Sequence, residues 1–181
     1  MSKLSASSNA NILGTLSIYV VPVGKTFEEG AQCIFRDMLN KITNSARAHL
    51  LHLAIDNPPV YAVNPITEFR VGSGGAARTP TGSETSLYAQ INPSGKYNAT
   101  ALAKSYDPTG MVHTFTFELG PSECNGLTIS EVGLVANNNW LNNPAKGKLF
   151  NIKTFSEVVK SPGFSLVFVW KINFSGVYIH G

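Results

Sequence analysis

The stretch 163-GFSLVFVWKINF-174 decides the fold of this chain. Its large apolar side chains fall on every second residue, at Phe164, Leu166, Phe168, Trp170, Ile172 and Phe174. Side chains of an extended strand point alternately to opposite faces, so this spacing predicts a strand with one buried face. The stretch therefore predicts a β-sheet that covers a hydrophobic core.

Five shorter β-rich runs precede this stretch at fairly even spacing. Glycine, proline, asparagine and serine, which favour turns, separate them. The runs are ITEFRV (66–71), ATALA (99–103), MVHTFTFEL (111–119), GLTISEVGLVA (126–136) and KLFNIKTF (148–155). They predict several antiparallel strands.

The N-terminal part predicts one strand and one long helix. LGTLSIYVVPV (13–23) is rich in β-formers, and a capping box of Thr26 and Glu29 follows it. We expect the helix to run on to Ile55, because the prolines at 58–59 end it. The apolar residues after the box recur at helical spacing, at Phe27, Ala31, Ile34, Phe35, Met38 and Ile42.

These elements predict a mainly β (α+β) fold, an antiparallel β-sandwich with one long N-terminal helix packed against it. The expected organisation has three parts. A polar N-terminal arm (1–12) precedes a strand and helix that serve as a docking element (13–60), and a β-sandwich-like domain fills 61–181.

The chain is poor in charge. Of its 181 residues 43% are hydrophobic and only 14% are charged, against about a quarter in typical soluble domains. Its net charge of +3 comes without a run of basic residues, which argues against nucleic-acid binding. No apolar run reaches the length of a membrane span and no signal peptide is recognisable. We therefore expect a soluble protein made in the cytosol, which hides much of its surface against partners.

The glycine-rich stretch 69-FRVGSGGAARTPTGSE-84 has the composition of a phosphate-binding loop. Such a loop needs Gly-Lys-Ser/Thr at its end, and this tripeptide does not occur here. A dinucleotide-binding loop needs a helix that begins directly at the glycines, whereas TPTGSETSLYAQI (79–91) leads back to strands. We interpret the glycines as a long turn between β elements, and we expect no cofactor.

The sequence does not point to catalysis or to metal binding. His49 and His52 have a spacing that can share a metal, but only Asp56 lies near enough to add a ligand. No Gly-x-Ser-x-Gly motif occurs, and neither Cys33 nor Cys124 has the context of a nucleophile. We predict neither catalytic residues nor a small-molecule substrate.

Glu131 stands out because it lies mid-strand among apolar residues. If it shares the buried face with Ile129, its charge needs a partner. Candidates for that partner are Lys153, Lys160 and Arg78. If instead Val132 and its alternate neighbours point inward, Glu131 faces solvent. The sequence leaves both placements open.

Four motifs follow one another in the second part of the chain: ITEFRVGSGG (66–75), TPTGSETSL (79–87), NGLTISEVGLV (125–135) and LFNIKTFSEVVKSPGFSLVFVWKINF (149–174). In this order and spacing they resemble a family of bacteriophage virion proteins from tails, collars and baseplates. The resemblance implies that residues 61–181 form a β-sandwich-like virion domain, a module for attachment inside a virion without catalytic residues. Glu131 and Lys160 match family positions, and we expect them to form a structural ion pair. The lengthened loop NNNWLNNPAKGK (137–148) and the N-terminal strand and helix depart from the pattern.

From this resemblance we expect a non-enzymatic structural component of a phage tail, neck or baseplate. It would form a homo-oligomer and join fibre or ring proteins to the tail, with no contact to nucleic acid or membrane. The residues expected to contact other subunits are Phe27, Phe35, Met38 and Trp140. The alternatives are a receptor- or carbohydrate-binding fibre module, with Trp140 as a sugar platform, and a capsid decoration protein.

Overall fold

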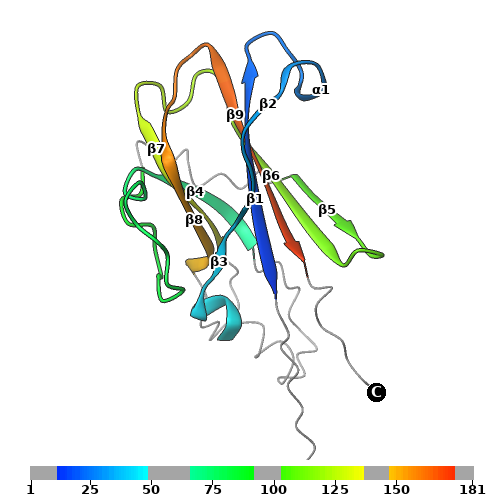
Figure 1. Ribbon diagram of the computed structural model, residues 1–181, viewed down its shortest axis with the longest axis vertical. Coiled ribbons are helices and arrows are strands. Elements are labelled where there is room, and N and C mark those ends of the chain that lie inside the picture. Colours follow the sequence, from blue (N-terminus) through cyan, green and yellow to red (C-terminus); the bar gives the residue numbers. More distant parts are fainter. Residues whose placement is uncertain (1–11, 49–65, 92–102, 137–146, 174–181) are drawn as a thin grey trace, which may run out of the picture.

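The chain folds into two antiparallel β-sheets packed against each other (Figure 1). The computed structural model describes residues 12–48, 66–91, 103–136 and 147–173. The five-stranded sheet has the order β2 (Gln32–Leu39), β1 (Leu13–Pro22), β9 (Phe164–Asn173), β6 (Val112–Leu119) and β5 (Ala103–Asp107). The four-stranded sheet has the order β3 (Lys41–Ile42), β8 (Lys148–Val159), β7 (Thr128–Ala136) and β4 (Ile66–Gly72). The β-rich, antiparallel part of the predicted fold agrees with this architecture.

β9 lies at the centre of the five-stranded sheet, between β1 and β6. Phe164 is half-buried against the core, and Phe174 lies outside the described residues. The other alternate residues of the quoted stretch are at most 1% exposed, namely Leu166, Phe168, Trp170 and Ile172. The strand predicted from the period-2 pattern, with its buried face, is therefore confirmed.

Aromatic side chains from both sheets fill the core between them. Phe69 of β4 stacks on Phe117 of β6, with ring centroids 4.3 Å apart, and its centroid lies 5.1 Å from that of Phe168 on β9. The ring of Trp170 meets Phe69 edge-on, at a centroid distance of 6.3 Å. Because each such pair adds about 0.5–1.5 kcal/mol beyond the burial of its area, these contacts help to hold the two sheets together.

The predicted long N-terminal helix is wrong. Its capping box does form: the backbone N–H of Glu29 donates to Oγ1 of Thr26 at 3.3 Å, and the N–H of Thr26 donates to Oε2 of Glu29 at 3.2 Å. The box caps only one turn, α1 (Phe27–Gly30), after which the chain extends into β2 beside β1. A capping box marks where a helix begins, but it does not set the length of the helix.

Irregular pairing of β2 explains why its residues have helical spacing. Leu16 of β1 pairs with Met38 and Ile18 pairs with Phe35, so β2 uses one residue more than β1 over this span. Asp37, with a φ of 43°, lies in this bulge. The extra residue places Phe35 and Met38 three positions apart, although both pack against the core. A bulged strand thus imitates the period of a helix.

A second short helix follows β3 and is described over residues 44–48. The buried Thr43 caps it, because its Oγ1 accepts a hydrogen bond from the N–H of Ala46 at 3.1 Å. The N–H of Thr43 donates to the carbonyl of Phe150 at 3.1 Å, which ties the helix start to β8. The remainder of the predicted helix, to Ile55, lies outside the described residues.

Residues 13–42 belong to the sandwich itself. β1 lies inside the five-stranded sheet, and the chain crosses to the four-stranded sheet between β2 and β3. Leu16 and Ile18 of β1 are fully buried in the core that also holds β9. Within the described ranges, the predicted docking element (13–60) and the predicted sandwich domain (61–181) therefore share one core.

Candidate functional site

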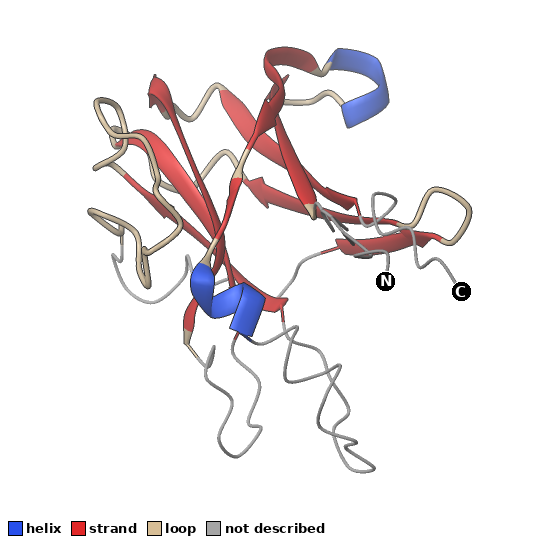
Figure 2. Cartoon of the chain, turned by 60° about the horizontal axis from the view of Figure 1, so that its bottom comes forward, coloured by secondary structure: helices blue, strands red, loops and turns tan. Residues whose placement is uncertain are grey.

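The glycine-rich stretch belongs to a long loop, residues 73–91, beside the face of the four-stranded sheet that points away from the core (Figure 2). Leu87 of this loop packs there in a small apolar cluster, separate from the main core, with Val135, Leu149 and Ile152. One face of the sheet is thus covered by the other sheet, and the loop packs on the opposite face.

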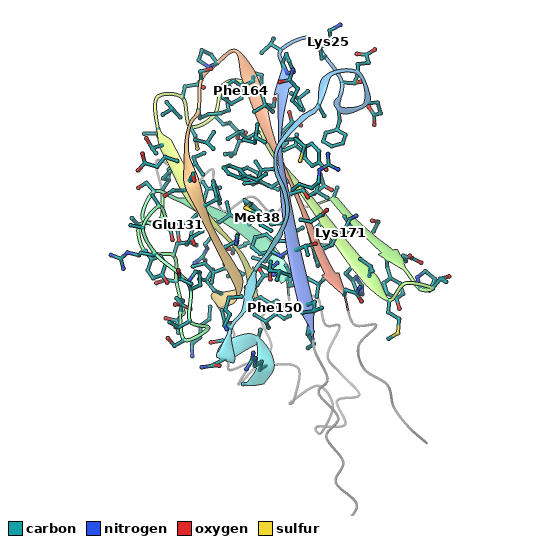
Figure 3. All side chains as sticks on the ribbon, viewed as in Figure 1. Lys25, Met38, Glu131, Phe150, Phe164 and Lys171 are labelled. Atoms are coloured by element: carbon teal, nitrogen blue, oxygen red, sulfur yellow. The ribbon has the colours of Figure 1, made fainter. Side chains whose placement is uncertain are left out.

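Glu131 of β7 binds this loop. Val132 and Leu134 point into the core between the sheets, so Glu131 points to the opposite face, toward the loop (Figure 3). Its side chain is fully buried. The carboxylate accepts three backbone hydrogen bonds, from the N–H groups of Gly74 at 3.0 Å, Tyr88 at 2.9 Å and Ala89 at 2.7 Å. Backbone donors therefore satisfy this buried charge in place of water.

Each of the two predicted placements of Glu131, on the buried face or facing solvent, is correct in part. Val132 points inward, as in the solvent-facing alternative, yet Glu131 is buried, as in the other. The sequence could not separate them, because the cover comes from Ala89 and Gly74, 42 and 57 positions away.

The glycines allow the loop backbone to approach β7 closely. A Cβ on Gly75 would collide with the carbonyl oxygen of Ser130, and a Cβ on Gly72 would lie 2.5 Å from Oε1 of Glu131. The N–H of Gly75 donates to Oγ of Ser130 at 3.0 Å. Since the N–H groups of Gly74 and Gly75 are bound to β7 side chains, they are not free to bind a phosphate. The stretch resembles a phosphate-binding loop in composition because its glycines bring backbone N–H groups to an internal anion, the carboxylate of Glu131.

The predicted ion pair between Glu131 and Lys160 does not form. Lys160 is also fully buried, but its Nζ donates to the carbonyl of Ser161 at 2.7 Å and to Oδ1 of Asn125 at 3.3 Å. The ammonium lies over the ring of Phe164, 5.1 Å from its centroid. Burial lowers the pKa of Lys160. Glu131 and Lys160 thus stabilise two different turns.

The two other candidate partners of Glu131 have different surroundings. The guanidinium of Arg78 lies over the ring of Tyr88, 4.6 Å from its centroid. Lys153 lies half-buried on β8, where burial lowers its pKa. The backbone N–H groups of the loop therefore take the role that the sequence assigned to a lysine or an arginine.

A second carboxylate, that of Glu84, organises a tight turn within the loop. It accepts hydrogen bonds from the N–H groups of Thr81 at 2.8 Å and Gly82 at 2.7 Å, and from the hydroxyl of Tyr88 at 2.9 Å. Burial by itself raises the pKa of Glu84, but the hydrogen bonds outweigh it and lower the pKa from 4.5 to about 2. Burial and the bond to Glu84 raise the pKa of Tyr88 to about 12. Neither group is poised for acid–base chemistry near neutral pH.

Of the four residues predicted to contact other subunits, the three that the structure describes do not share one exposed surface. Phe35 and Met38 pack against the core, and the ring of Phe35 lies 5.4 Å from that of Phe155. Phe27 is 39% exposed. Its ring meets the ring of Tyr19 edge-on, with centroids 5.0 Å apart. Trp140 lies outside the described residues. Phe27 is the described member that remains exposed for a contact.

Phe27 belongs to one end of the sandwich, which we term the α1 end (top of Figure 1). Three segments form it: residues 23–30 around α1, the β6–β7 turn (120–127), and the end of β8 with the turn that follows (157–163). Backbone hydrogen bonds join the segments, from the N–H of Val23 to the carbonyl of Gly163 at 3.1 Å and from the N–H of Gly126 to the carbonyl of Lys160 at 2.9 Å. The α1 end is therefore one connected surface.

Large apolar side chains are exposed over all three segments of the α1 end, namely Val23 (57%), Phe27 (39%), Leu127 (36%) and Val159 (62%). Sequence reasoning found only Phe27. The available signal was an apolar residue directly beside turn-forming residues, as in Pro-Val-Gly at 22–24 and Asn-Gly-Leu at 125–127. Such residues lie where a strand ends and the opposite sheet no longer covers them.

The described residues contain neither a metal-binding group of side chains nor a helix that could span a membrane. Within the described ranges, no group of three or more His, Cys, Asp and Glu side chains is arranged to hold a metal ion. The pair His49 and His52 lies outside those ranges. His113 of β6 stacks on Tyr106 of β5, with ring centroids 4.4 Å apart. Over the same ranges, no helix has the length and apolar character needed to cross a membrane.

Comparison of the chain with protein-family models, with curated proteins and with solved structures gives no match.

Proposed function

We propose that this chain is a non-enzymatic structural subunit of a bacteriophage tail, neck or baseplate. In this role it assembles with other copies of itself and joins fibre or ring proteins to the tail, after synthesis in the host cytoplasm. The observation that carries the proposal is the α1 end, where four large apolar side chains from three connected segments are exposed. Exposed apolar side chains at one end of a fold suit a contact with another protein.

The buried charges support a structural role. The carboxylate of Glu131 is bound by three backbone N–H groups, and the ammonium of Lys160 by a carbonyl and an amide oxygen. Groups held in this way fix turns and are not positioned to attack a substrate. The low fraction of charged residues, 14%, also suits a subunit whose surface is covered in an assembly. The motifs between residues 66 and 174 that resemble phage virion proteins supply the proposed location.

Mass spectrometry of purified particles tests this function. Virions of the phage that encodes the chain would be purified on a density gradient, and their tails would be separated from their heads. The proposal expects the chain in intact particles and in the tail fraction. Its absence from particles overturns the proposal, and its presence on heads alone would favour a capsid decoration protein instead.

A further inference from the structure

The α1 end carries acidic as well as apolar side chains. Glu28, Glu29 and Glu157 are exposed there and Glu123 is half-buried. In the described segments of this end, the cations are the exposed Lys25 and the buried Lys160. The α1 end is therefore an apolar surface with an excess of negative charge, although the whole chain has a net charge of +3.

Part of the opposite end of the sandwich has the opposite charge. It is formed by β3, the helix at residues 44–48 and the first residue of β8, and we term it the β3 end (Figure 3, near Phe150). Lys41, Arg47 and Lys148 are exposed there, and these segments contain no acidic residue. The exposed Asp107 lies at the same limit of the strands, but on β5 at the edge of the five-stranded sheet. Two exposed apolar side chains lie at the strand ends on this side, Leu13 (53%) and Leu39 (64%).

The two ends lie at opposite limits of the same strands. β1 runs from Leu13 at the β3 end to Pro22 at the α1 end, and β8 runs from Lys148 to Val159 in the same sense. Ten residues of extended chain separate the ends of β1 by roughly 30 Å. The two surfaces of one molecule therefore cannot contact each other, but they can contact those of another copy.

We propose that the α1 end of one copy of this chain binds the β3 end of the next copy, head to tail. The inference rests on the proposed structural function and names one partner, a second copy of this chain. In this contact the acidic side chains of the α1 end face Lys41, Arg47 and Lys148, while the exposed apolar side chains of both ends pack together. Complementary charge of this kind selects the partner and sets its orientation.

A symmetric contact between two α1 ends is disfavoured by the same charges. It would bring Glu28, Glu29, Glu123 and Glu157 of one copy toward those of the other. Like charges brought together at an interface oppose association. A head-to-tail contact uses two different surfaces, so it repeats from copy to copy and closes into a ring or continues as a filament.

Sedimentation velocity of the full chain at low salt, over a series of concentrations, tests the contact. We expect species larger than a monomer, and we expect them to dissociate as salt is raised, because the attraction between exposed charges is screened. A chain that remains monomeric at all concentrations and salt levels overturns the inference. So does an assembly that is unaffected by the charge variants described next.

Charge reversal at each end gives the decisive comparison. Glu28→Lys with Glu157→Lys makes the α1 end basic, and Arg47→Glu with Lys148→Glu makes the β3 end acidic. Either pair of substitutions alone leaves like charges facing each other and should raise the dissociation constant about tenfold or more, a change of about 1.4 kcal/mol. Mixing the two variants in equal amounts should restore assembly, since each then offers the complement of the other. Failure of the mixture to assemble, with both variants folded by circular dichroism, overturns the inference.

Failure of the head-to-tail contact can be distinguished from failure of the proposed function. A chain that is found in virion tails but stays monomeric alone retains the structural role and loses the head-to-tail contact. A chain that assembles through its two ends but is absent from particles retains the contact and loses the virion role.

Discussion

The carboxylate of Glu131 in β7 accepts a hydrogen bond from the backbone N–H of Gly74, 57 residues earlier, at 3.0 Å. Its two oxygens also bind the N–H groups of Tyr88 and Ala89. The start and the end of the 73–91 loop are thus joined to one side chain of the four-stranded sheet. The conformation of this loop depends on a negative charge that water does not reach.

Replacing that charge should destabilise the protein. In Glu131→Gln, the amide keeps the volume of the side chain, but its NH₂ group cannot accept the hydrogen bonds that one carboxylate oxygen accepts. Because buried donors are left unpaired, we expect the free energy of unfolding to fall by about 2–4 kcal/mol. Urea denaturation followed by circular dichroism measures this change. Glu118→Gln, on an exposed position of β6, is the matched control and should change stability by less than about 0.5 kcal/mol. Equal effects of the two substitutions would contradict the role given to Glu131.

The glycines that pack on β7 give a second prediction. In Gly75→Ala, the new Cβ would collide with the backbone carbonyl of Ser130, which cannot move without distorting β7. We expect a loss of about 1–3 kcal/mol, the usual cost of overpacking. Thermal unfolding would be compared with that of Gly163→Ala, where the nearest atom, Oγ of Ser161, lies at an ordinary 3.7 Å. If both substitutions are tolerated equally, close approach is not the reason for a glycine at position 75.

The sequence predicts the strands of this protein better than it predicts its helix. β9 is regular, so alternate residues from Leu166 to Ile172 show its buried face directly. β2 contains irregular pairing, and the extra residue near Asp37 changes a period of two into a spacing of three between Phe35 and Met38. Local periodicity cannot distinguish a bulged strand from a helix, because the pairing with β1 that creates the bulge is not a local property.

The candidate sites also depend on contacts between residues that are distant in the sequence. The sequence singles out Glu131 as an acid among apolar residues but leaves its burial open. It cannot identify the partners of Glu131 either, because they are backbone N–H groups of a distant loop and carry no side-chain signature. Side-chain charge offers Lys153, Lys160 and Arg78 as partners, and the resemblance to phage virion proteins favours Lys160, which is bound to Ser161 and Asn125. The α1 end was found only in part for a related reason, since its apolar residues come from three segments that the fold alone brings together.

The shifted pKa of Glu84 predicts how stability depends on pH. Its pKa is about 2 in the folded protein and 4.5 without these contacts, so its contribution to stability is present above pH 4.5 and is lost as the pH falls toward 2. We therefore expect a drop in the melting temperature between these pH values that is smaller in Glu84→Gln. Differential scanning fluorimetry over pH 2–5 measures both profiles. Parallel profiles of the two proteins in this range would contradict the assignment.

The partner of Glu84 predicts a change at the alkaline limit. Tyr88 has a pKa of about 12 in place of 10, so its contribution is present below pH 10 and is lost as the pH rises toward 12. Tyr88→Phe removes both the titrating group and its bond to Glu84. We expect the variant to be less stable than the parent at pH 8 and to lose less stability between pH 10 and 12. Thermal unfolding at these pH values gives the comparison, and an identical alkaline loss in both proteins would assign it to other groups.

Lys160 provides a last prediction, in which shape and hydrogen bonding are separated. Lys160→Ala removes a fully buried stem together with the ammonium group that donates to Ser161 and Asn125, whereas Lys160→Met keeps most of the volume and removes only the ammonium group with its charge. We expect a loss of about 2–4 kcal/mol for alanine and a smaller loss for methionine, because a cavity adds to the unpaired carbonyl.

The pH dependence should differ as well. Burial lowers the pKa of Lys160, so folding disfavours its charged form and the parent gains stability as the pH rises toward 10.5. The methionine variant lacks this gain in urea denaturation at pH 7 and pH 10, and a gain of equal size in both proteins would show that another group titrates.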